Sequence, residues 1–152
     1  MKRLLALLLI LFCPDTTLAL VKITASEVYS QVMQIDKEVD LLLQHFNISR
    51  KKIADTYRAD LRPRHVWVKT YIIMVKINVL RNKLGLPRNE PNYMAPEDDY
   101  ASGLVFEQTQ RLQAELHILK KLLGIQGNTE LQQFNGKRPI DVFNRLHHVS
   151  YQ

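Results

Sequence analysis

The sequence predicts an all-α protein, an antiparallel up-and-down bundle of three long helices and one short C-terminal helix, built from an internal helical repeat. Four similar five-residue stretches, ASEVY, PRHVW, PEDDY and PIDVF, begin at Ala25, Pro63, Pro96 and Pro139. After each stretch, apolar residues recur in steps of three and four, the spacing of one helix face. Helices with one apolar face need neighbours, and short connections favour an antiparallel arrangement.

Residues 1–19, before the first repeat, have the layout of a cleavable export signal. Two basic residues precede an apolar run from Leu4 to Phe12, and small residues stand before the expected cleavage after Ala19. The run is about nine residues long, whereas a membrane-spanning helix needs roughly twenty. We therefore expect one mature domain over residues 20–152, without a transmembrane helix, in the periplasm or outside the cell.

The composition excludes several classes of exported protein. The only cysteine, Cys13, lies in the expected signal. A mature chain without it has no disulfide, no thiolate nucleophile, no cysteine metal site and no attached c-type haem. The apolar fraction of 46% is typical of a globular domain. These features exclude several classes of exported protein but do not identify an activity.

The first two predicted helices, over residues 25–48 and 63–86, are equal in length and share start and end signals. Proline suits the first helical position, and an acid in the first turn faces the positive end of the helix dipole. Asn47 and Gly85 stand at matching places where a left-handed residue ends a helix. The apolar face of each helix, its seam, comprises Val28, Val32, Ile35, Val39, Leu42 and Phe46 in the first helix and Val66, Thr70, Ile73, Ile77, Leu80 and Leu84 in the second.

The third predicted helix begins at Pro96, is about six residues longer, and closes around Gly124. Its seam comprises Val105, Thr109, Leu112, Leu116, Leu119 and Leu123. The fourth predicted helix, over residues 139–152, reaches only about 21 Å at 1.5 Å per residue. It therefore covers part of the groove left by the other three. Either the bundle tapers, or a partner supplies the missing half.

The second predicted helix carries apolar residues outside its seam, among them Ile72, Val75 and Val79. A helix that is apolar around most of its circumference is usually buried centrally. These three residues are the candidate apolar interface, because the alternative is a surface for a partner or for a second copy of the chain.

A stripe of basic residues follows the same helix. Arg62, Lys69, Lys76 and Lys83 recur every seven residues, which places them along one side of the helix. Arg58 and Arg64 lie nearby, and the whole chain has a formal net charge of +6. A charge stripe is most often a solvated face; the functional alternative is a docking surface for an anionic envelope component or an acidic protein.

Four aromatic residues, Tyr29, Trp67, Tyr100 and Phe143, follow the four helix starts. One turn into a helix, an aromatic side chain can pack against the incoming chain. In an antiparallel bundle these residues form two small clusters, one at each end. Neither cluster has the polar partners of a cofactor site.

The motifs of known catalytic and metal sites do not occur. The chain has no Glu-x-x-His pair of a di-iron bundle, no zinc-protease motif, no phosphate-binding glycine loop and no nucleophile elbow. We therefore expect no enzyme and no cofactor. Nucleic acid is not an expected ligand either, because export separates the protein from it and no binding motif is present.

The sequence thus predicts an exported, non-enzymatic bundle that acts as a protein-interaction module or accessory factor in the cell envelope. Its partner would be a protein or an anionic envelope component, and the alternative is a homodimer. The alternative function is a sensor or carrier that binds a small ligand in the bundle core.

Overall fold

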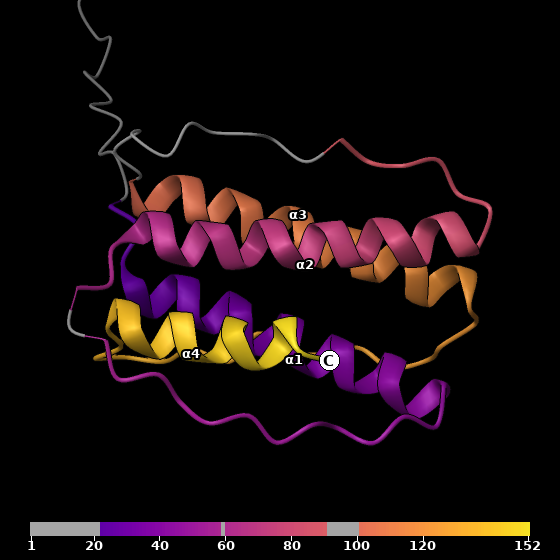
Figure 1. The fold of residues 1–152 in the computed structure, drawn as a ribbon, viewed down its shortest axis with the longest axis horizontal. Helices are drawn as coiled ribbons and strands as arrows, with labels where there is room; N and C mark the ends of the chain where they lie inside the picture. Colours follow the sequence, from indigo (N-terminus) through magenta and orange to yellow (C-terminus); the bar gives the residue numbers. More distant parts are fainter. Residues whose placement is uncertain (1–21, 59, 91–100) are drawn as a thin grey trace, which may run out of the picture.

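The computed structural model describes residues 22–58, 60–90 and 101–152. These residues form four α-helices, α1 (Ala25–His45), α2 (Pro63–Lys83), α3 (Ser102–Leu122) and α4 (Pro139–Ser150) (Figure 1). The described residues contain no strand, which confirms the predicted all-α class. The predicted export signal and the PEDDY stretch lie outside the described residues. Within the described ranges, no helix is long and apolar enough to cross a membrane.

The helices run parallel, so the predicted antiparallel arrangement is wrong. The first residues of the four helices, Ala25, Pro63, Ser102 and Pro139, line one small cavity. Figure 1 shows all four helices running from left to right, with the described parts of the connections lying along the outside. The parallel arrangement is possible because an extended connection can span the whole length of a helix. A 21-residue helix is about 32 Å long, a length that about ten extended residues cover.

The four helices form a ring. Each helix packs against two others, in the order α1, α3, α2, α4 and back to α1, whereas α1 and α2, like α3 and α4, are diagonal to each other. The second helix is therefore not the central one, and its outer side faces solvent at Val75 and Val79. A helix in such a ring buries its seam and leaves an outer face exposed.

The third helix begins later than predicted, at Ser102 instead of Pro96. With this start α3 has 21 residues, the same length as α1 and α2. A valine then stands fourth and an aromatic residue fifth in every helix: Val28 and Tyr29, Val66 and Trp67, Val105 and Phe106, Val142 and Phe143. The aromatic positions consequently gather at one end of the bundle, not at two.

The predicted seams meet on the bundle axis in layers of equivalent residues. The first three layers are Val28, Val66, Val105 and Val142, then Val32, Thr70, Thr109 and Leu146, then Ile35, Ile73, Leu112 and Val149, and all of these side chains are buried. The hydroxyls of Thr70 and Thr109 donate to the carbonyls of Trp67 and Phe106, each at 2.6 Å. Their polar atoms therefore fit an apolar core without remaining unpaired.

The three long helices end in the same way. Asn47, Gly85 and Gly124 have φ values of 55°, 73° and 67°. The following amide N–H of Ile48, Leu86 and Ile125 donates back to the carbonyl of Leu43, Arg81 and Lys120, at 2.8, 2.9 and 2.9 Å. This is the Schellman pattern, in which a left-handed residue satisfies the last free carbonyls of a helix. The predicted stop signals are confirmed at all three positions.

The described parts of the connections lie over the grooves between neighbouring helices. The first connection contacts α1 and α4, since Arg50 pairs with Asp36 and Asn144 donates to the carbonyl of Thr56. In the second, Asn89 bonds with Asn78 of α2 and Glu115 of α3.

The third connection receives hydrogen bonds from Gln34 of α1 and Lys120 of α3. No connection among the described residues crosses the groove between α2 and α4, which faces the viewer in Figure 1.

Candidate partner-binding face

Two of the predicted basic residues of α2, Lys69 and Lys76, contact α4, and Lys83 lies seven residues further along the same side of α2. Lys69 is half-buried, with its Nζ 5.3 Å from the ring centroid of Phe143 and 5.8 Å from that of Tyr151. Burial lowers the pKa of the Lys69 amine. The Nζ of Lys76 donates to the carbonyl of Ser150, near the end of α4. Lys83, in the last turn of α2, is exposed.

We call Lys69, Lys76 and Lys83 the lysine edge. No ion pair among the described residues includes any of them. Three positive charges on one side of a helix therefore have no carboxylate partner within the described chain. Such a row raises the local concentration of negative groups in solution.

The three predicted arginines are not part of this edge. Arg58 pairs with Asp60 of its own connection, at 2.8 Å between the guanidinium and the carboxylate. Arg62 precedes α2, and its backbone N–H donates to Nδ1 of His65 at 2.9 Å. Arg64 is exposed in the first turn of the helix. The structure thus divides the six predicted basic residues into a lysine edge beside α4 and a separate group at the start of α2.

An aromatic cluster on α4 lies beside the lysine edge. The ring of His147 stacks on Phe143 with centroids 5.9 Å apart, and meets Tyr151 edge to face at 4.9 Å. Nδ1 of His147 is buried and has no hydrogen-bond partner among the described residues. Burial, followed by the positive charge of Lys69 and a contribution from His148, lowers the pKa of His147, while Asp55 raises it. The neutral imidazole is therefore the form that the fold favours.

We expect acidification to weaken the fold through His147. Because the folded-state pKa is lowered, the unfolded chain takes up the proton first as the pH falls below about 6.5, and the folded state loses stability. Urea unfolding at about pH 7.5 and about pH 5 should show a smaller loss for His147→Gln than for the wild type. The exposed His45→Gln is the control. Equal losses in the wild type and His147→Gln would contradict this role.

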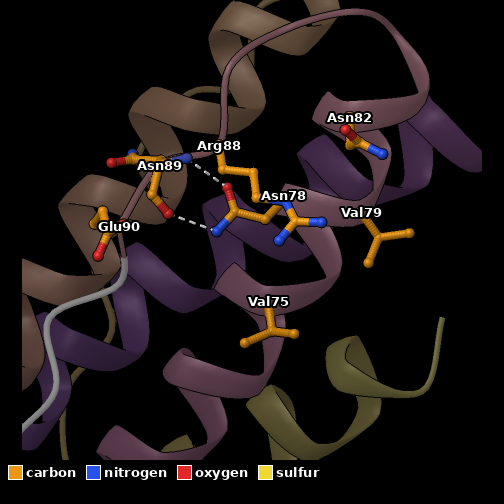
Figure 2. Close-up of a pocket in the computed structure, with 7 residues that line it drawn as sticks. All are labelled: Val75, Asn78, Val79, Asn82, Arg88, Asn89 and Glu90. Atoms are coloured by element: carbon orange, nitrogen blue, oxygen red, sulfur yellow. Dashed lines mark hydrogen bonds between the residues drawn. The ribbon is translucent and has the colours of Figure 1, made fainter.

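The predicted apolar interface lies on the outer side of α2. Ile72 is half-buried, whereas Val75 and Val79 are 41% and 55% exposed. The two valines line a surface pocket of about 380 Å³ beside the second connection (Figure 2). In this pocket Asn78 pairs with both backbone groups of Asn89, at 2.6 and 2.8 Å. The pocket is therefore built on a connection that its own side chains hold in place.

A second hollow begins where α4 ends. α4 has 12 residues and the other helices 21, so the outer layers of the bundle have three seam residues instead of four. The groove beyond the end of α4 has a volume of about 230 Å³. We call it the α4-end groove. Its lining is almost entirely apolar and includes Val39, Leu42, Phe46, Ile77, Leu80 and Leu119, with Lys76 at its rim.

Gln152 turns the end of α4 towards the first connection. Its side-chain oxygen accepts the backbone N–H of Lys51 at 2.9 Å, and its amide nitrogen donates to the carbonyl of Lys51 at 3.3 Å. The same nitrogen donates to the carbonyl of His148 at 3.0 Å. The end of α4 is thus tied to the α1 side of the bundle.

Three ion pairs between helices, which were not predicted from the sequence, follow one rule. Glu38 of α1 pairs with Lys120 of α3 at 2.5 Å, and Glu115 of α3 pairs with Arg81 of α2 at 2.5 Å. Arg145 of α4 pairs with Asp36 of α1 at 2.9 Å. In each pair the second residue stands five positions further along its helix than the first. Parallel coiled coils have the same pattern of flanking charges.

The sequence contains a signal for these three ion pairs. The first member of each pair stands directly before a seam residue, and the second member directly after one. Charged residues in these two positions flank the core of a helical bundle and can reach a neighbouring helix. The signal becomes usable only once the neighbour and its direction are known.

Among the described residues, no group of three or more His, Cys, Asp or Glu side chains is placed to hold a metal ion. Comparison of the chain with protein-family models, curated proteins and solved structures finds no match.

Proposed function

We propose that the protein is an exported, non-enzymatic interaction module or accessory factor of the cell envelope, and that its contact surface is the face between α2 and α4. The observation that carries this proposal is the α4-end groove. The layout of residues 1–19 supports export, and the absence of catalytic motifs from the sequence supports a role in binding.

The groove is an apolar surface of the kind that a partner covers. Phe46 is 42% exposed at its rim, although it occupies a seam position. Each apolar Å² removed from water contributes roughly 25 cal/mol, so covering this surface favours association. Amphipathic helices bind in apolar grooves of this type.

We also propose that the chain consists of copies of one unit, a helix followed by a returning connection. The equal lengths of α1, α2 and α3 and their identical helix ends support this repeat. On this interpretation α4 is a copy with 12 residues instead of 21, and the groove lies beyond its end.

Photo-cross-linking in the native host tests the interaction function. p-Benzoylphenylalanine in place of Phe46 should form an adduct with a defined protein, identified by mass spectrometry. Leu131 in the third connection is 50% exposed and is the matched control position. Adducts with the same proteins at both positions, or no adduct at Phe46, would remove the groove as the contact surface.

The alternative function, a small-ligand sensor or carrier, would use the same groove. The cavity lined by the four helix starts measures about 20 Å³, room for about one water molecule. A ligand that binds only the folded state raises the melting temperature with its concentration. If native mass spectrometry of protein purified from the host finds a bound apolar small molecule, and that molecule raises the melting temperature, the carrier function replaces the interaction module.

A further inference from the structure

We propose that the partner of the α4-end groove is an amphipathic helix that continues the course of α4 and places an acidic residue against Lys76. This inference rests on the proposed function, because it specifies the chemistry of the partner at the same surface. Three observations define that chemistry: the incomplete layers, the pattern of ion pairs, and the charge of the lysine edge.

The incomplete layers require apolar side chains at a fixed spacing. Val39, Ile77 and Leu116 are the fifteenth residues of α1, α2 and α3, and Leu42, Leu80 and Leu119 are the eighteenth. In the layers nearer the helix starts, α4 supplies the fourth side chain, as Leu146 and Val149 do. A helix that completes the outer layers therefore carries apolar residues three positions apart, followed by another four positions later.

The ion pairs between helices indicate which position of the bound helix carries the acidic residue. Glu38 and Glu115 are the fourteenth residues of α1 and α3, and each binds a basic nineteenth residue on the next helix of the ring, Lys120 and Arg81. Lys76 is the fourteenth residue of α2, and the next helix of the ring is α4. α4 ends at Ser150, its twelfth residue, so no described residue stands at the nineteenth position, and the Nζ of Lys76 donates to the carbonyl of Ser150 instead. Because Lys76 is positive, a negative residue at that position completes the pattern.

The opposite rim of the groove is apolar. The nineteenth residue of α1 is Leu43, which is 9% exposed and lines the groove. By the same rule, Leu43 corresponds to the fourteenth position counted from Pro139, which is Gln152, and the side chain of Gln152 bonds to the backbone of Lys51. The two rims thus differ, one apolar and one basic, and this difference selects the direction of the bound helix as well as its charge.

The lysine edge argues against a second copy of the chain as the occupant. A copy that presented Ile72 and Val79 of its own α2 to the groove would bring its Lys76 and Lys83 along the same face. Like charges brought together across an interface oppose association, so a symmetric contact here is unfavourable. An acidic helix instead offers carboxylates to three lysines that have none.

Peptide binding to the chain expressed from Leu20 tests the proposal. The acidic probe is a helix-stabilised peptide with leucine at positions i, i+3 and i+7 and glutamate at i+4; the basic probe has lysine at i+4. Fluorescence anisotropy should show about fivefold tighter binding of the acidic probe, the effect of one partly exposed ion pair. Lys76→Glu should reverse this preference. Lys121→Glu, the same charge change on the exposed side of α3, should leave it unchanged.

The outcomes separate this inference from the proposed function. If Phe46 cross-links to a protein in the host but the two probes bind equally, the interaction module stands and the acidic helix is wrong. If Lys76→Glu keeps the preference for the acidic probe with circular dichroism unchanged, the role of Lys76 is wrong. A dimer in sedimentation experiments that Phe46→Asp abolishes would replace the acidic helix by a second copy. If neither probe binds and Phe46 yields no adduct, both proposals fail.

Discussion

Replacing Lys120 by methionine is expected to destabilise the bundle by about 3–5 kcal/mol, because it leaves a buried charge without its partner. The side chains of Lys120 and Glu38 are 4% and 7% exposed, and their charged atoms lie 2.5 Å apart. Lys120 also donates to the carbonyl of Gly127 at 2.7 Å, and Thr129 donates to Glu38. The pair therefore joins α1, α3 and the third connection, and its loss should loosen all three.

Urea unfolding of the single and double variants measures this effect. Glu38→Leu together with Lys120→Met removes both charges and should recover most of the lost stability, since an apolar pair of similar volume often matches a buried ion pair. Lys121→Met, at an exposed site next to Lys120, should change the free energy of unfolding by less than about 0.5 kcal/mol. A double variant no more stable than Lys120→Met would contradict the explanation by an unpaired charge.

Spin labels attached to the first turns of α2 and α4 should lie close together. Arg64 and Ile140 are each the second residue of their helix, α2 and α4, which pack against each other. Parallel helices place these positions at the same end of the bundle, whereas antiparallel helices would separate them by most of a helix length.

The chain from Leu20 contains no cysteine, so Arg64→Cys with Ile140→Cys gives two defined label sites. Arg64→Cys with Lys83→Cys provides a scale, because these residues are 19 positions apart on one helix, or about 28 Å. Pulsed electron resonance should give a clearly shorter distance for the first pair. Equal distances for the two pairs would support the antiparallel bundle and overturn the parallel one.

Local signals predicted much of the fold correctly. The seam positions, such as Val32 and Leu112, are buried as the spacing of three and four predicts. Asn47, Gly85 and Gly124 end the long helices because a left-handed residue has the same effect in any bundle. The predicted start of the third helix at Pro96 is wrong. PEDDY carries a proline and acids, which are also helix-start signals, whereas the stretch that matches the other helix starts is Ser102–Phe106.

The sequence predicted only those parts of the candidate site that lie on a single helix. Lys69, Lys76 and Lys83 share an edge of α2 because seven residues are close to two helical turns. Arg58 follows no helix and pairs with Asp60 instead. The α4-end groove draws on α1, α2 and α3 together, so no single stretch of sequence contains it.

The sequence by itself determined the number of helices, the residues that each turns inward, and where the long helices end, because these depend on contacts within a few residues along the chain. Only the tertiary structure decided the direction of the helices and their order in the ring. An amphipathic helix buries the same seam beside a parallel or an antiparallel neighbour, and extended connections are long enough for either. The choice is expressed in contacts between distant segments, above all the ion pairs from Glu38 to Lys120 and from Arg145 to Asp36, which align only when the helices are parallel.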